Sequence, residues 1–152
     1  MDAGLLKQLG INQDQVVQGS QKQFPSYFDS ARDKAQTIIL NRVAKEFYPD
    51  PPHWAIPEEQ LHRVFESYSL TGNWRKTNRQ LGICRHGKKE ISINFGHVNM
   101  TEEQCYRTIV HEYIHALQYL IFNTSGHDKQ FWFYLHLCVP TLNKHLEQRI
   151  IK

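Results

Sequence analysis

The feature that most constrains this 152-residue chain is an H-E-Y-I-H motif at residues 111–115, followed by a Gly-His step at residues 126–127. On a helix, residues four positions apart lie on the same face, so His111 and His115 can bind one metal ion together. Glu112 lies beside them and is not needed as a ligand. It is placed to deprotonate a metal-bound water, whose pKa zinc lowers toward neutrality. The motif predicts one catalytic zinc ion and the chemistry of peptide hydrolysis.

The sequence around the motif predicts a helix. Thr101 is the expected N-cap, and Gln104 stands at the capping-box position. Apolar residues then recur at helical spacing, at Tyr106, Ile109, Val110, Tyr113, Leu117 and Leu120. The polar residues 123–126 end the helix, and Gly126 can adopt the left-handed conformation that turns the chain back. The two histidines of the motif therefore lie in mid-helix. The alternative is a solvent-facing pair on a surface helix.

The third ligand distinguishes the classes of zinc peptidase. A metzincin has glycine and histidine where this chain has Gln118 and Ile121, so that class is excluded. Glu147 is the only glutamate after Glu112, and it lies in a charged stretch typical of a solvated surface. His127 opens a new amphipathic segment directly after the glycine turn. His127 is therefore the predicted third ligand.

Other polar residues near the site have several possible roles. Asp128 is either an acceptor behind a ligand or a favourable charge in the first turn of the next helix, and the second role is favoured. His97 and His136 are expected to be structural or surface residues, because a catalytic zinc keeps its fourth position for water. The sequence does not rank three candidates for stabilising the oxyanion, Tyr106, Tyr119 and Tyr134.

The residues around the motif resemble the SprT-like zinc metalloproteases, the family that includes Spartan. The stretch V-H-E-Y-I-H-A-L-Q, then G-H-D-K-Q-F-W, is similar to the family's H-E-x-x-H, its Gly-His or Pro-His step and the aromatic residue after it. L-G-I-C at residues 81–84 and E-I-S-I-N-F at residues 90–95 look like the family's pair of strands. The resemblance extends over about residues 30–138. It implies the fold, a three-histidine zinc site, a glutamate base and a role in digesting proteins bound to DNA.

Composition predicts a single domain, because 40% hydrophobic and 12% aromatic residues suffice for a core. We expect the metalloprotease domain at residues 27–152, after a weakly structured or partly helical arm at residues 1–26. The three scattered cysteines Cys84, Cys105 and Cys138 fit neither a disulfide-built secreted protein nor an added cysteine-rich zinc module. With no signal peptide or membrane-length apolar run, we expect a cytoplasmic protein, nuclear if eukaryotic, with no membrane contact.

Hydrophobic periodicity predicts the remaining elements. Helices are expected from Tyr27 to Phe47 and from near Pro57, and a shorter helix follows the third histidine. Residues 65–70 could belong to the second helix or to the first strand. Residues 72–96 predict a small antiparallel sheet with a turn at residues 86–88. The expected fold is an α+β minimal zincin, in which this sheet packs on the H-E-x-x-H helix between flanking helices.

A basic cluster near the sheet has two interpretations. It lies beside Trp74 and comprises Arg75, Lys76, Arg79, Arg85, Lys88 and Lys89. These residues could form a phosphate track for single-stranded DNA, with Trp74 as a stacking platform. Alternatively, they are a solvated sheet edge whose charges discourage edge-to-edge pairing, and Trp74 is a core residue. The net charge of +3 is mild and does not demand a nucleic-acid partner.

Three functions are consistent with the sequence. The first is a SprT-like endopeptidase that acts on DNA-associated proteins. The second is a zinc peptidase with another protein target and no DNA dependence. The third is a non-enzymatic module in which zinc is structural and the basic cluster binds nucleic acid. Glu112 argues against the third, because a structural zinc site is closed by a fourth protein ligand and has no use for a base. The oligomeric state stays open.

Overall fold

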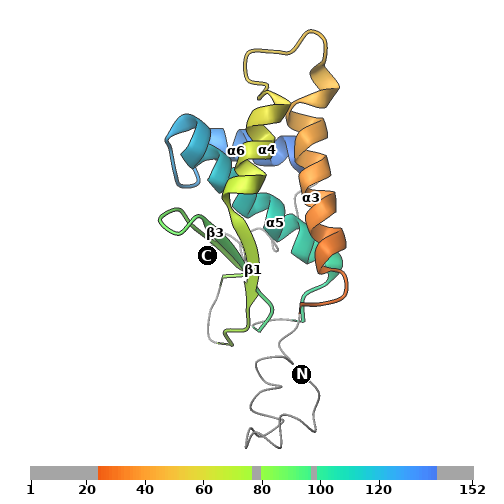
Figure 1. Ribbon diagram of the computed structural model, residues 1–152, viewed down its shortest axis with the longest axis vertical. Coiled ribbons are helices and arrows are strands. Elements are labelled where there is room, and N and C mark those ends of the chain that lie inside the picture. The colour runs from red at the N-terminus through yellow and green to blue at the C-terminus, as the bar shows by residue number, and fades with distance from the viewer. Residues whose placement is uncertain (1–23, 77–79, 97–98, 140–152) are drawn as a thin grey trace, which may run out of the picture.

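The computed structural model describes residues 24–76, 80–96 and 99–139, which form an α+β fold (Figure 1). The predicted arm at residues 1–26 lies almost wholly outside these residues. The helices are α3 (Phe28–Val43), α4 (Glu58–Ser67), α5 (Glu102–Leu117) and α6 (Lys129–Cys138). The strands are β1 (Ser69–Asn73), β2 (Gly82–Arg85) and β3 (Glu90–Asn94). No helix in the described part of the chain is long and apolar enough to cross a membrane.

The α+β class is confirmed, and one detail of the sheet is corrected. β2 and β3 form the expected antiparallel hairpin, but β1 runs parallel to β3, so the sheet is mixed rather than antiparallel. The strand order is β1-β3-β2. Consecutive strands are usually neighbours, but here the connection after β1 leads to the far edge of the sheet. The hairpin then returns β3 between the other two strands, where it must run parallel to β1.

The helices before the sheet begin where their sequences predict. The apolar stripe of α3 is buried, and the helix ends at Val43, while the last predicted turn is a short 3-10 helix, η1 (Lys45–Phe47). α4 follows Pro57 and continues to Ser67, so the ambiguous stretch at residues 65–70 is divided, with 65–67 in the helix and 69–70 in β1. Leu61 on this helix is fully buried, and burying a leucine side chain contributes about 1.5–3 kcal/mol.

α5 is the central element of the fold. It contacts the other three described α-helices, β2 and β3, so nearly its whole circumference is buried (Figure 1). The predicted capping box is present, since Gln104 N donates to Thr101 Oγ1 at 3.1 Å and Thr101 N donates to Gln104 Oε1 at 3.0 Å. A core helix that is capped in this way holds its side chains in fixed positions.

The chain leaves α5 through a wider turn than the sequence suggested. A π-helical segment, η2 (Gln118–Phe122), follows α5 and ends at Asn123, which has a left-handed φ of 55°. Gly126 has a φ of 88°, as the expected chain reversal requires. Short π-helical segments are frequent at functional sites. This one brings the chain back toward the face of α5 that carries the motif.

Candidate metal centre

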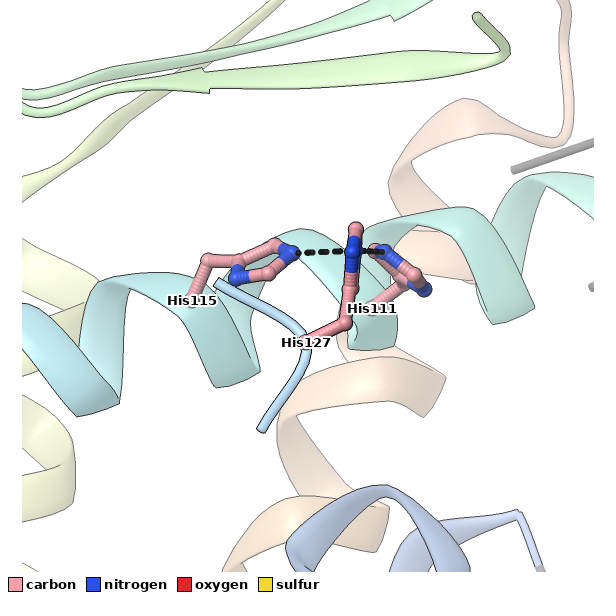
Figure 2. A group of neighbouring side chains, drawn as sticks. All are labelled: His111, His115 and His127. Atoms are coloured by element: carbon pink, nitrogen blue, oxygen red, sulfur yellow. Dashed lines mark hydrogen bonds between the residues drawn. The ribbon is translucent and has the colours of Figure 1, made fainter. Parts of the chain in front are cut away.

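The structure brings the three predicted histidines together (Figure 2). Nε2 of His127 lies 3.2 Å from Nε2 of His115 and 3.4 Å from Nε2 of His111. A tetrahedral zinc ion with nitrogens at about 2.0–2.1 Å separates its ligand atoms by about 3.3 Å. The three nitrogens therefore have the spacing that one ion needs, and these residues could hold a metal ion.

The three imidazoles differ in burial but share one protonation state. His111 is 1% exposed, His115 is half-buried and His127 is exposed. Burial lowers the pKa of His111 and of His115 to about 3, and the neighbouring imidazoles act in the same direction. Burial also lowers the pKa of His127. Neutral imidazole is the form that binds a metal, so the site is ready to bind without first releasing protons.

A buried amide links the helix ligand to the turn that carries the third histidine. Gln118 is fully buried, and its Oε1 lies 3.0 Å from Nδ1 of His115, which donates to it. This bond leaves the lone pair of His115 on Nε2, where the metal would bind. Nε2 of Gln118 donates to the carbonyl oxygen of Gly126 and to Oδ1 of Asp128, both at 3.1 Å. One side chain thus orients one candidate ligand and anchors the turn next to another.

Asp128 combines the two roles considered for it. Its carboxylate caps α6 by accepting from Phe131 N at 2.9 Å, so it is the N-cap rather than a first-turn residue. Its Oδ1 also accepts from Gln118, the residue that orients His115, so Asp128 supports that candidate ligand indirectly. Sequence reasoning missed Gln118, and the only signal for it was its place three residues after His115, on the same helix face.

Glu112 lies in the same site but points its carboxylate at the sheet. It is 3% exposed, and burial raises its pKa to about 8. A Cβ on Gly82 would lie 3.1 Å from Oε2 of Glu112 and 2.7 Å from Cγ2 of Thr108. Strand β2 can approach α5 this closely only because residue 82 is glycine. The approach places the carboxylate beside the first residue of an edge strand.

The three histidines and Glu112 line a cleft of about 180 Å³. Its opposite wall is formed by β2 and the residue that follows it, through Gly82, Cys84 and His86. A larger cleft of about 590 Å³ lies between the end of α3 and the start of α4. The one group of three side chains that could hold a metal ion among the described residues lies in the smaller cleft, which is therefore the candidate site.

The predicted basic cluster is divided between two ends of the sheet. Arg75 and Lys76 follow the end of β1, whereas Lys88 and Lys89 lie in the turn beside its start, where Ser69 N donates to the Lys89 carbonyl at 3.0 Å. A strand of this length separates the two pairs by about 15 Å. All four residues are exposed. They do not form one patch, and a nucleic acid would have to extend along the sheet to meet both pairs.

Two other members of the predicted DNA site have partners within the fold. Arg85 forms an ion pair with Glu90 at 3.2 Å. The half-buried ring of Trp74 stacks on Phe24 at a centroid distance of 6.0 Å and packs against Phe95. The geometry of Trp74 is that of a packed residue rather than an open stacking platform. Three residues considered from the sequence, Arg79, His97 and Glu147, lie outside the described residues, and His136 is exposed on α6.

The family model of the SprT-like family matches residues 57–148, more than half of the chain. The chain belongs to the SprT-like family. The matched residues begin at the start of α4 and include the sheet, α5 and all three histidines. No curated protein and no solved structure matches the chain. The helix α3 precedes the region shared with other SprT-like proteins, although it packs against the metal-site helix.

Proposed function

We propose that this SprT-like chain is a zinc-dependent endopeptidase. The observation that carries the proposal is a buried carboxylate, Glu112, in the same cleft as three imidazole nitrogens at metal-binding spacing. Three neutral imidazoles suit zinc and leave its fourth tetrahedral position for water or substrate. A purely structural zinc site needs a fourth protein ligand, and among the described residues the metal-ligating group has three members.

The reaction we propose uses Glu112 as the proton carrier. A bound zinc ion would supply a Lewis acid that lowers the pKa of water toward 7 and polarises the scissile carbonyl. Glu112 accepts a proton from the water that attacks the carbonyl carbon, and then delivers it to the leaving nitrogen as the C–N bond breaks. In the metal-free chain burial raises the pKa of Glu112 to about 8. That shift favours a carboxyl group that can both take up and release a proton near neutral pH.

A polypeptide substrate is supported by the wall of the cleft. β2 is an edge strand, and its residues from Gly82 to Cys84 line the cleft opposite the histidines. An extended peptide can add to such an edge through main-chain hydrogen bonds. We propose that the substrate lies along β2 with its scissile bond beside Glu112.

We propose DNA-associated proteins as the substrate class. The family resemblance supports this class, as do the exposed pairs Arg75–Lys76 and Lys88–Lys89 at the two ends of the sheet. The packing of Trp74 does not support base stacking. The alternative is a zinc peptidase with another protein target and no DNA dependence, and it uses the same catalytic groups. The further alternative, a non-enzymatic zinc-stabilised nucleic-acid-binding module, leaves the buried Glu112 without a role.

The test of the peptidase is a comparison of zinc content and cleavage of a basic DNA-binding protein. Glu112→Gln should keep stoichiometric zinc and lose activity by about 10²–10⁴-fold, because it removes the base and keeps the size. His115→Ala should lose metal as well. Glu102→Gln, at an exposed position of the same helix, is the matched control and should behave as wild type. Cleavage by Glu112→Gln at close to the wild-type rate would refute the mechanism.

The DNA link is tested in the same assay with and without single-stranded DNA. Replacing Lys88 and Lys89 by alanine should reduce the slope of log K against log salt by about 1.4, since each phosphate contact on a single strand contributes about 0.7. Zinc content should not change. If the wild type shows no affinity for single-stranded DNA at low salt, the DNA-independent peptidase becomes the better proposal.

A further inference from the structure

His86 lies in the catalytic cleft without belonging to the metal-ligating group. It directly follows β2, on the wall opposite the three histidines. Two contacts hold its ring. The ring stacks on Tyr119 with centroids 4.2 Å apart and planes 7° apart, and its Nδ1 lies 2.6 Å from the hydroxyl of Tyr68. The imidazole is therefore held by two residues from different parts of the chain, Tyr68 just before β1 and Tyr119 in η2.

The surroundings of Nδ1 select one tautomer of His86. Nδ1 faces the Tyr68 hydroxyl at 2.6 Å and Sγ of Cys84 at 3.8 Å. Burial raises the pKa of Tyr68 and of Cys84, so both groups keep their protons and can donate. Nδ1 is the acceptor when the Tyr68 hydroxyl donates to it, and we infer this arrangement. The ring proton then resides on Nε2, the nitrogen that does not face Tyr68.

We propose that His86 is a catalytic residue that donates a hydrogen bond from Nε2 to the scissile carbonyl oxygen as negative charge develops there. The inference rests on the proposed peptidase function. The proton stays on Nε2 throughout, so the step needs no further acid or base. A donor held in place before the reaction needs no reorganisation, and one such donor contributes about 10²–10³-fold to kcat.

The three tyrosines considered from the sequence fit this assignment. Tyr134 is buried and donates to the carbonyl oxygen of Trp54 at 2.8 Å. Tyr106 is buried beneath Lys34, which lies 4.2 Å from the centre of its ring. Tyr119 does reach the site, but as the surface on which His86 stacks. We therefore assign the donor to the imidazole rather than to a tyrosine.

The test compares three variants of the zinc-loaded protein. His86→Phe keeps a ring on Tyr119 and removes the donor, so kcat should fall by about 10²–10³-fold with KM nearly unchanged. Zinc content should stay stoichiometric. His53→Phe is the matched control, because it makes the same replacement at an exposed histidine outside the cleft, and it should retain the wild-type kcat. His86→Gln, whose amide can donate from a similar position, should recover part of the loss. A kcat for His86→Phe close to that of the wild type would overturn the assignment.

A second measurement does not depend on activity. Nitrogen-15 NMR of the wild type should show the His86 proton on Nε2, and Tyr68→Phe should weaken that preference. A proton on Nδ1 overturns the inference even if His86→Phe fails to fold. Glu112→Gln in the same assay separates the two proposals. If Glu112→Gln is as active as the wild type, the peptidase mechanism fails and the role of His86 fails with it. If only Glu112→Gln loses activity, the role of His86 alone is overturned.

Discussion

The two halves of the candidate metal centre are held in place by different means. His111 and Glu112 lie on α5 and are 1% and 3% exposed, so the packing of the whole fold positions them. His127 lies on an exposed turn between η2 and α6, and one buried amide, Gln118, anchors that turn. Exposed turns open at a lower free energy than core helices. We infer that the helix half is rigid without metal, whereas the turn half depends on a few local hydrogen bonds.

The largest expected contrast comes from removing one ligand from each half. His111→Ala and His127→Ala should both lose stoichiometric zinc. In the presence of a chelator, His111→Ala should also lose roughly 2 kcal/mol or more of unfolding free energy, because it leaves a cavity in the core. His127→Ala should change that free energy by less than about 0.5 kcal/mol, as an exposed substitution does. Urea denaturation and metal analysis measure both, and equal losses of stability would contradict the comparison.

Gln118 is the link between the halves, and its removal should weaken the site without dismantling it. Gln118→Leu keeps the volume but loses the bonds to His115, Gly126 and Asp128. We expect zinc to bind about 10–100-fold more weakly, as is usual when a residue behind a metal ligand is replaced. Chelator competition measures the affinity.

The matched control for Gln118 is Gln130→Ala. It removes the 2.7 Å side-chain hydrogen bond between Thr124 and Gln130 in the same turn and leaves the three bonds of the Gln118 side chain in place. Its zinc affinity should stay near that of the wild type. If both variants lose affinity equally, the stability of the turn matters and the orientation of His115 by Gln118 does not.

A substitution at Gly82 tests whether the position of Glu112 on α5 depends on the close approach of β2. Gly82→Ala places a methyl group 2.7 Å from Thr108 Cγ2 and 3.1 Å from Glu112 Oε2. We expect a loss of about 1–3 kcal/mol in unfolding free energy and about tenfold in kcat through displacement of the carboxylate. Gly87→Ala is the control, since a Cβ there meets nothing within 4 Å. Unchanged activity in Gly82→Ala would show that the carboxylate tolerates movement.

The stability of the metal-free protein should depend on pH through the buried groups of the helix half. Burial lowers the pKa of His111 and His115 from 6.5 to about 3, so their contribution to stability is full above pH 6.5 and is lost as the pH falls toward 3. Burial raises the pKa of Glu112 from 4.5 to about 8, so its contribution is lost as the pH rises through that interval. Below pH 6.5 the two histidines raise the stability with increasing pH by more than the one glutamate lowers it. Above pH 6.5 only the glutamate still changes the stability, so the unfolding temperature should be highest near that pH.

Thermal unfolding with a chelator, followed from pH 4 to pH 8, measures this profile. Glu112→Gln should remove the decline on the alkaline side and steepen the rise between pH 4.5 and 6.5, where the carboxyl group otherwise opposes the two histidines. His127 carries a smaller share because it is exposed. A profile that is flat on the acidic side would contradict the difference in burial between the two halves.

The sequence by itself determined the parts of this protein that are encoded within one or two helical turns. The cap at Thr101, the common face of His111 and His115 and the chain reversal at Gly126 all follow from local spacing and backbone preference. The hairpin between β2 and β3 was predictable for the same reason, since its turn is short.

Only the tertiary structure decided the features that depend on which distant segments pack together. The parallel pairing of β1, the position of His86 opposite the histidines and the division of the basic residues all result from the strand order β1-β3-β2. Gln118 likewise becomes a link only because the π-helical turn returns the chain past it. Long-range contacts such as these depend on the free energy of the whole core and on the path of its connections. No local pattern in the sequence encodes them.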